Sequence, residues 1–450
     1  MLKGLFKKIQ KKQPISKNKT HQPVIIPRAE HTISRTMISH NALKVLYRLN
    51  SAGYSAYLVG GCVRDLLLNK QPKDFDIATN ALPEEIRKLF RNCRLIGKRF
   101  RLAHVVFGKE IIEVATFRTH HQEGQEKHGH MHEGMIIRDN VYGAIEDDVW
   151  RRDFTVNALY YNIDDFSIID YTGGMQDLKA NMLRMIGDPV QRFHEDPVRL
   201  LRAVRFMGKL GLQISPETEK PLQDLSDLLA NVSPARLYQE VLKFFQEGAT
   251  LNTFKLFQQY RLFAQLFPQT APVLASQPEA AKLVEAALYN TDQRLQAGKT
   301  VSPAFLFAAF LWHPILNYVK HAQEGGLPIH VAYEKALKAV LRNQTASLTI
   351  PRHLIVTIQE ICFLQHRFTC RYGSAPLRLL DHPRFRAGYD LLLLRTAAGE
   401  ATGELSDWWT QFYHGTPEQR EALMKTVSQA NPKKKRRRRP RIKKHPAKQD

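Results

Sequence analysis

The spacing of apolar residues changes near residue 195, and this change constrains the fold more than any other feature of the chain. Between about residues 40 and 190, helical and extended patterns alternate, with helical spacing over Ala42 to Leu49 and extended spacing over Ala56 to Val59. Later segments such as Pro234 to Phe245 are Leu-rich and helical throughout. The sequence therefore predicts a mixed α/β or α+β domain followed by an all-helical part.

Composition divides the chain further, because its two ends lack any core-forming pattern and are rich in basic residues. We expect both ends to be disordered when free. The five predicted segments are a basic disordered arm (1–35), a mixed domain (36–190), a helical neck (191–250), a helical body (251–430) and a basic disordered tail (431–450).

Positive charge is concentrated at these ends. The formal net charge is +23, and residues 1–29 and 433–450 carry +18 of it. Basic ends on a chain whose remaining part has little net charge are typical of proteins that bind a nucleic-acid phosphate backbone. Basic side chains that neutralise phosphates release bound counterions, which favours binding. An anionic membrane surface is the alternative, since Leu2, Leu5 and Phe6 share one helical face between lysines. For residues 1–35 we favour a disordered basic arm over a helix on a membrane, with weak membrane-surface contact as the alternative. We interpret the basic tail at residues 433–450 as an RNA-binding arm.

The four cysteines are scattered and form no CxxC pair, which argues against a disulfide framework or a zinc ribbon. The longest apolar run, Ala304 to Trp312, is far shorter than the roughly 20 residues that a membrane-spanning helix needs. The N-terminus has no apolar stretch long enough for a secretory signal. These features predict a cytoplasmic protein without a transmembrane segment.

Two neighbouring motifs carry the strongest chemical signal. Leu58 to Asp65 reads as a strand, a turn at Gly60 and Gly61, and a helix with Arg64, an arrangement that suits phosphate binding. A tight turn with a surface arginine is the alternative. About ten residues later, Asp74 and Asp76 would share one face of a strand, and shared Mg²⁺ ions would relieve their mutual repulsion. An acidic surface turn is the alternative interpretation.

Further charged residues extend this set. Glu113 lies in an otherwise apolar strand pattern, where a buried carboxylate is costly unless it is paired or coordinated. It is a candidate third carboxylate, with an ion pair to a residue such as Arg118 as the alternative. Arg152 and Asp153 precede another apolar stretch, where Arg152 suits phosphates and Asp153 suits a ribose or metal. A simple helix cap at Asp153 is equally consistent with the sequence.

A helix is predicted to begin at Asp196 and Pro197, with Arg199 and Arg202 on one face. These arginines suit hydrogen bonding or stacking on a base, and a solvated cationic stripe is the alternative. The histidines between His120 and His132 lie among Gln, Gly and Lys residues without apolar support, so we interpret this segment as a mobile loop with incidental metal affinity.

Taken together, the motifs at Gly60–Asp65, Asp74–Asp76, Arg151–Leu159 and Glu195–Arg199 resemble the class II nucleotidyltransferase superfamily. This superfamily contains CCA-adding tRNA nucleotidyltransferases and bacterial poly(A) polymerases. The segments Leu95–Val105 and His382–Asp390, together with the arginine-rich tail, look like the polymerase branch. The resemblance covers about residues 30 to 415 and implies a polymerase-β-like head with a mixed β-sheet, followed by a helical neck and body.

The resemblance implies a reaction and a set of site residues. The reaction is attack of an RNA 3′-hydroxyl on the α-phosphate of ATP with two Mg²⁺ ions, for which Mn²⁺ could substitute. Asp74 and Asp76 would bind metal, and Asp153 and Glu113 would complete the catalytic set. The residues that match nucleotide-contacting positions are Gly60, Gly61, Arg64, Arg152, Asp196, Arg199 and Arg202.

Two other functions remain open on this evidence. A CCA-adding enzyme would share the motifs of the head. A non-catalytic RNA-binding protein would keep the fold, although clustered carboxylates near RNA bring such a protein no benefit. We expect low RNA sequence specificity, marked salt dependence and a monomer.

Overall fold

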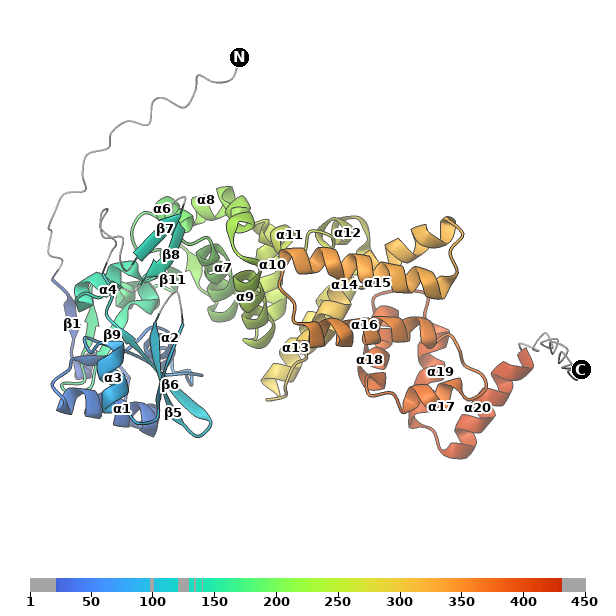
Figure 1. Cartoon of the computed structure of the whole chain (residues 1–450), viewed down its shortest axis with the longest axis horizontal. Helices are drawn as coiled ribbons and strands as arrows, with labels where there is room; N and C mark the ends of the chain where they lie inside the picture. Colours follow the sequence, from blue (N-terminus) through green and yellow to red (C-terminus); the bar gives the residue numbers. More distant parts are fainter. Residues whose placement is uncertain (1–21, 98–100, 120–128, 133–134, 140, 431–450) are drawn as a thin grey trace, which may run out of the picture. The chain divides into compact units, whose positions relative to one another are not determined.

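The computed structural model describes residues 22–97, 101–119, 129–132, 135–139 and 141–430 (Figure 1). The chain divides into two compact units. The first comprises the residues up to Arg199 together with Gly211–Asp224, and the second comprises Leu200–Leu210 and the residues from Leu225 onward. The first boundary between the units falls within one helix, α7 (Val198–Leu210).

The first unit is built on a mixed eight-stranded sheet with the order β1-β10-β9-β2-β3-β6-β5-β4. β3 and β6 are parallel, and the other neighbouring strands are antiparallel. The expected α+β class with a mixed sheet is confirmed. The strands are β1 (Val24–Ile26), β2 (Ala56–Val59), β3 (Asp76–Thr79), β4 (Cys93–Ile96), β5 (Leu102–Phe107), β6 (Glu110–Thr116), β9 (Leu159–Asn162) and β10 (Ile168–Asp170).

Helices and two smaller sheets complete this unit. The two-stranded sheets pair β7 (Gly129–His132) with β8 (Met135–Asp139) and β11 (Met182–Leu183) with β12 (Gln213–Ile214). β12 is a short exception to the expected helical character beyond residue 195. The helices are α1 (His40–Ser51), α2 (Gly61–Leu67), α3 (Pro83–Leu89), α4 (Ile145–Arg151), α5 (Gly174–Lys179), α6 (Pro189–Glu195) and α8 (Pro216–Asp224), with short 3₁₀ turns at Arg28–Glu30, Arg35–Met37 and Thr155–Asn157.

Alternate side chains of β2 lie on opposite faces of the sheet, and each face packs against a different hydrophobic core. Ala56 and Leu58 are buried in one cluster, which also contains the apolar face of α1. Tyr57 and Val59 contribute to a second cluster, which contains Val149 of α4. Because side chains on a strand alternate between faces, this division also determines on which face each neighbouring polar residue lies.

The predicted disordered arm over residues 1–35 is wrong for its last part. β1 pairs with β10, and Ile26 and Ile33 are buried in the core of the sheet. His31 Nε2 donates to the Phe166 carbonyl at 2.8 Å. A three-residue apolar run between prolines is too short to show a period, and its strand state depends on a partner far along the chain. Residues 1–21 and 431–450 lie outside the described residues.

Within its described residues the second unit is helical throughout, which confirms the prediction for this half of the chain. After a 3₁₀ segment at Ser226–Asn231, its helices are α9 (Pro234–Gln246), α10 (Thr250–Gln259), α11 (Leu262–Leu266), α12 (Ala271–Ser276), α13 (Pro278–Gln296), α14 (Pro303–Glu324), α15 (Ile329–Ser347), α16 (Arg352–Arg367), α17 (Ala375–Leu380), α18 (Phe385–Ala397), α19 (Gly403–His414) and α20 (Pro417–Ala430). No helix in the described part of the chain is long and apolar enough to cross a membrane.

The longest helix, α14, contains Pro314 within its span. Proline lacks the N–H that would bond the carbonyl four residues earlier, which belongs to Phe310. The buried hydroxyl of Thr270 donates to that carbonyl instead, at 3.1 Å. A contact between sequence-distant residues thus supplies the missing hydrogen bond of the helix.

We expect Thr270→Val to lower the free energy of unfolding by about 1–3 kcal/mol, because it keeps the shape but leaves the Phe310 carbonyl without this donor. Urea denaturation would measure the loss. Thr345→Val is the control, because the Thr345 hydroxyl donates to Leu341 within the same helix, whose carbonyl also accepts a backbone bond. Equal losses in the two variants would contradict this explanation.

Candidate active site

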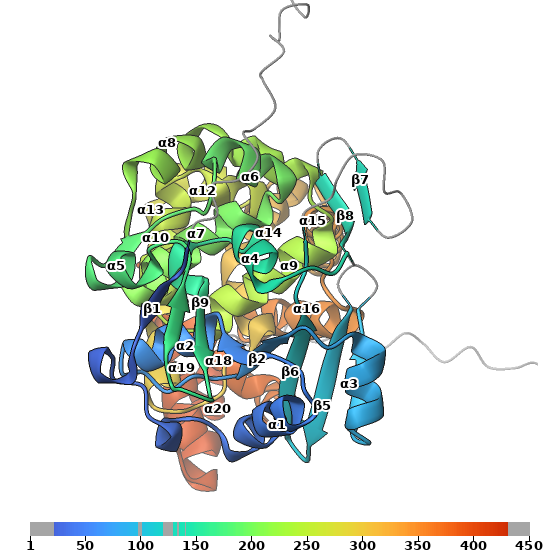
Figure 2. The same cartoon turned by 90° about the vertical axis from the view of Figure 1, so that its left-hand side faces the viewer.

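Four residues form one row across the second face of the sheet. Val59 pairs with Tyr160 of β9, and Asp76 pairs with Glu113 of β6. The antiparallel register sets Leu58 opposite Ile77, and one further step in the same register would set Val59 opposite Asp76. The order across the sheet is therefore Tyr160, Val59, Asp76 and Glu113, and the strands β9, β2 and β6 can be followed in Figure 2.

The carboxylates occupy this row and its edge. Asp76 begins β3 and is half-buried, whereas Asp74 precedes the strand and is exposed, so the expectation of two aspartates on one strand face is wrong. A bend at Lys73 and Asp74 precedes the strand. The Glu113 side chain is 41% exposed and lies 3.4 Å from His104 Nε2. The expected burial of Glu113 is also wrong, and the imidazole of His104 lies beside its carboxylate.

The double glycine forms a turn that only glycine readily adopts. Gly60 has a φ of 79° and a ψ of −134°. A β-carbon at Gly60 would lie 3.6 Å from Arg152 Nη1, and one at Gly61 would lie 3.5 Å from Arg64 Nη2. The turn therefore brings the backbone close to two arginines from different parts of the chain.

Cys62 follows this turn and is an unreactive thiol. Its Sγ donates to the Val59 carbonyl at 3.3 Å and approaches the Asp76 carbonyl at 3.9 Å. Burial, with the negative charge of Asp76 nearby, raises the pKa of Cys62 to about 12. The residue therefore connects β2, α2 and β3 through packing, and it has no nucleophilic character at neutral pH.

A hydrogen-bonded chain joins the glycine turn to Asp153. Arg64 Nη1 donates to Asn157 Oδ1 at 2.6 Å, and Asn157 Nδ2 donates to Asp153 Oδ1 at 3.0 Å. The same Asp153 oxygen accepts the Phe154 backbone N–H at 2.8 Å. Sequence reasoning did not assign Asn157 a role, although a polar residue within this apolar stretch was a usable signal. Asp153 precedes a 3₁₀ turn and does not cap an α-helix.

Arg152 is held by two residues that sequence reasoning missed. Its Nε donates to the Tyr160 hydroxyl at 2.8 Å and to Asp148 Oδ2 at 3.1 Å, and its Nη2 donates to Asp148 Oδ2 at 2.8 Å. The Tyr160 hydroxyl in turn donates to the same Asp148 oxygen at 2.6 Å. Burial opposes the charge of Arg152, but Tyr160 and Asp148 outweigh it and raise the pKa of this guanidinium.

A second arginine group surrounds the end of α4. Arg192 Nη2 donates to the backbone carbonyls of Arg151 and Arg152 at 2.7 and 2.6 Å, and Arg192 Nη1 donates to Glu195 at 2.5 Å. Arg199 Nη1 donates to the Arg192 carbonyl at 2.7 Å and to Glu195 at 3.1 Å. Arg199 is therefore buried and engaged, so the alternative of a solvated stripe is wrong for this residue.

This group carries more positive than negative charge. Burial, with Arg118, Arg192 and Arg199 nearby, lowers the pKa of Arg151 to about 9. Burial and the charge of Arg199 lower the pKa of Arg192 to about 10, although Glu195 opposes this. Repulsion of this kind favours an anionic ligand, because an anion would relieve it.

The remaining predicted residues lie on α6 and α7. Asp196 follows α6, and its Oδ1 accepts the Val198 backbone N–H at 3.4 Å. Arg202 belongs to the second unit and lies over the Phe206 ring at 5.4 Å. The structure thus brings the glycine turn close to Arg64 and Arg152, and it links Arg64 to Asp153 through Asn157.

The carboxylates of the candidate site fit the binding of Mg²⁺ through few protein ligands. The described residues contain no group of three or more His, Cys, Asp or Glu side chains positioned to hold a metal. Mg²⁺ in proteins often takes only one or two carboxylates and completes its shell with water and substrate phosphates. Asp76, with Asp74 two residues before it, fits that mode of binding. The expected loop from His120 to His132 is wrong for residues 129–132, which form strand β7 paired with β8. Residues 120–128 lie outside the described residues.

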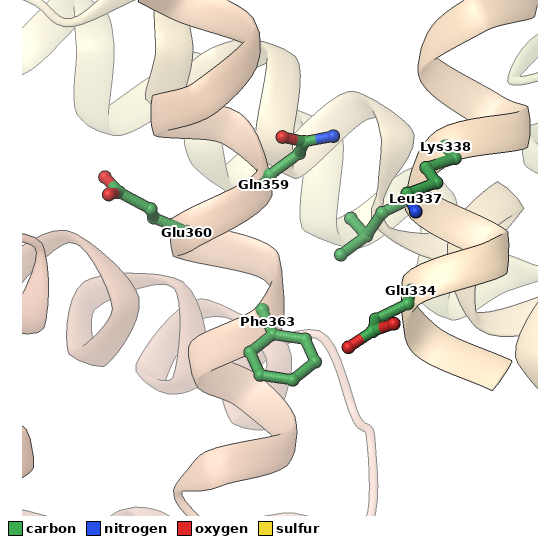
Figure 3. A pocket seen from close by; sticks show the side chains of 6 residues that line it. All are labelled: Glu334, Leu337, Lys338, Gln359, Glu360 and Phe363. Carbon is green, nitrogen blue, oxygen red and sulfur yellow. The ribbon is translucent and has the colours of Figure 1, made fainter. Parts of the chain in front are cut away.

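One surface pocket, of about 300 Å³, lies between α15 and α16 of the second unit (Figure 3). Leu337 and Phe363 supply its apolar side chains, and the polar residues around them are Glu334, Lys338, Gln359 and Glu360. None of the residues predicted for catalysis or nucleotide binding lines it.

Three family models match the chain. They are the Poly A polymerase head domain over residues 56–184, the probable RNA and SrmB-binding site of polymerase A over residues 211–274, and the polymerase A arginine-rich C-terminus over residues 325–443. Together they extend over both compact units.

CCA-adding enzymes are similar to this chain in part of the sequence and in fold. A CCA-adding enzyme from Lactobacillus gasseri is 38% identical over 216 residues, which are 48% of this chain and 52% of that protein. The solved CCA-adding enzyme of Bacillus stearothermophilus in complex with CTP shares the fold, with a TM-score of 0.54 and 24% identity over 86% of this chain and 91% of that one.

Bacterial poly(A) polymerases match over nearly the whole chain. Poly(A) polymerase I of Haemophilus influenzae is 47% identical, over 97% of this chain and 96% of that protein. Poly(A) polymerase I of Escherichia coli O6:H1 is 50% identical, over 93% of this chain and 92% of that protein. At this identity and coverage, the chain belongs to the bacterial poly(A) polymerase I family and is a polynucleotide adenylyltransferase.

Proposed function

We propose that the chain adds AMP from ATP to RNA 3′ ends without a template, by a two-metal mechanism, and that the resulting poly(A) tails promote RNA processing and decay in the cytoplasm. The observation that carries the proposal is the convergence of Asp76 and Glu113 with the Gly60 turn and Arg152 at one face of the sheet. Family membership over nearly the full length supports the choice of adenylate transfer.

The predicted site residues would bind metal ions and the triphosphate of ATP. Asp74 and Asp76 would hold two Mg²⁺ ions, or Mn²⁺ in their place, and such ions activate the attacking hydroxyl and neutralise triphosphate charge when bound. Arg64 and Arg152, beside Gly60 and Gly61, would contact the triphosphate. Asp153 and Glu113 would complete the acidic set.

The nucleotide and the RNA would also be bound by other parts of the chain. Asp196, Arg199 and Arg202 would contact the nucleotide, Arg199 and Arg202 at its base, and fixed side chains could select the base without a template. The neck and body, with the basic arm and tail, would bind the RNA through its phosphates. We further propose that the enzyme acts as a monomer with low sequence specificity.

The test incubates the purified chain and Mg²⁺ with an unstructured RNA and offers ATP, CTP, GTP and UTP separately. We expect long products with ATP alone, measured as product length on a gel. Two or three additions that need CTP and a tRNA lacking its end would identify CCA addition instead. No incorporation under any condition would favour a non-catalytic RNA-binding protein.

A further inference from the structure

The side chain of Arg152 is fixed far more tightly than a surface arginine would be. Two of its three nitrogens, Nε and Nη2, are engaged by Asp148 and Tyr160. Within the described residues Nη1 makes no hydrogen bond, and it lies 3.6 Å from the place that a β-carbon on Gly60 would occupy. The remaining donor edge therefore faces the glycine turn.

Arg152, Asp148 and Tyr160 form a mutually hydrogen-bonded group that is largely buried. Tyr160 is fully buried and Asp148 is 8% exposed. The Tyr160 hydroxyl accepts from Arg152 and donates to Asp148, so each of the three side chains contacts the other two. The Arg152 guanidinium also lies over the Tyr160 ring, at 5.1 Å from its centre. A free arginine loses considerable rotamer entropy when it binds a phosphate, and here that loss has already occurred during folding.

We infer that Asp148 and Tyr160 are positioning residues, which align the free edge of Arg152 for the triphosphate of the incoming nucleotide. The inference rests on the proposed function, because it requires that Arg152 contact the triphosphate. It assigns to Asp148 and Tyr160 no direct contact with the nucleotide. The position of Tyr160 in the sheet register, beside Val59 at the entrance to the glycine turn, accounts for the direction in which Arg152 is held.

The test uses Tyr160→Phe in the full-length enzyme, which removes the hydroxyl and keeps the ring. The Michaelis constant for ATP and the inhibition constant for pyrophosphate should both rise by about 3- to 10-fold, the effect of one lost hydrogen bond, while the Michaelis constant for RNA stays unchanged. Pyrophosphate is the informative probe because it carries the phosphates without a base. A merely structural role would not weaken phosphate binding selectively.

Tyr161→Phe is the matched control. Tyr161 is the next residue of β9, is equally buried, and faces the opposite core. Its hydroxyl has no hydrogen-bond partner among the described residues. Removing it should leave the constants for ATP, pyrophosphate and RNA at their original values.

Arg152→Ala separates the inference from the proposed function. If Arg152→Ala weakens pyrophosphate binding and Tyr160→Phe adds no further effect in that background, Tyr160 acts through Arg152 as inferred. If Arg152→Ala weakens binding but Tyr160→Phe behaves like Tyr161→Phe, or acts equally in both backgrounds, the inference fails and the proposed function stands. If Arg152→Ala has no effect, the proposed role of Arg152 fails, and the inference fails with it.

Discussion

Replacing Asp76 by Asn should reduce AMP incorporation by about a thousandfold or more while leaving the fold intact. The variant keeps the size of the side chain but removes the charge that would bind a metal. Metal ions supply several kcal/mol of transition-state stabilisation, and each 1.4 kcal/mol corresponds to about tenfold in rate. Product length and initial rate on an unstructured RNA would measure the loss, and Asp74→Ala should behave similarly.

The control for this variant is Asp224→Asn, an exposed aspartate of α8 in the same unit. It should retain normal incorporation. Thermal unfolding should give the same midpoint for both variants, because Asp76 is only half-buried at the start of β3. Normal incorporation by Asp76→Asn or Asp74→Ala would refute the proposed two-metal site.

Replacing Glu400 by Ala should destabilise the second unit by about 3–5 kcal/mol, the cost of leaving a buried charge without its partner. Glu400 accepts hydrogen bonds from Arg395 Nε at 2.9 Å and from Trp312 Nε1 at 2.9 Å. Its side chain is 11% exposed and that of Arg395 is 10% exposed. Without Glu400, Gln365 would be the remaining hydrogen-bond acceptor seen for Arg395 in the described residues.

Urea denaturation followed by tryptophan fluorescence would measure this effect, because Trp312, Trp408 and Trp409 all belong to the second unit. Glu404→Ala is the control. Glu404 also pairs with an arginine, Arg371, but its side chain is 87% exposed, so its loss should change the midpoint little. Equal midpoints for the two variants would show that the buried pair does not stabilise this unit.

Much of the architecture followed from local patterns. Short apolar runs of extended character located β2 and β6. Helical spacing located α1, α7 and α9, because a helix with one buried face must repeat its apolar residues at the helical period. The strand β1 could not be predicted from such patterns. Its three residues are too few to show a period, and pairing with β10 makes them a strand.

The candidate site was only partly accessible from the sequence. Gly60, Gly61 and Arg64 stand within one short motif, as do Arg152 and Asp153, and the structure joins the two motifs through Asn157. Neither motif contains a signal for the other. The expectation for Asp74 and Asp76 failed in detail, because a strand begins where its backbone finds a partner and not where a spacing rule starts.

The sequence by itself determined the order of elements, the chemical types available and the family, since these depend on short-range patterns and on residue identity. The tertiary structure alone decided which distant residues meet. Sheet register set Glu113 beside Asp76 and Tyr160 beside Val59, and α4 then placed Asp148 and Arg152 over that row. Arg192 acquired its role in the same way, through two backbone carbonyls about 40 residues away. Contacts between residues distant in the sequence depend on the free energy of the whole packed core, and this free energy cannot be read from a local sequence pattern.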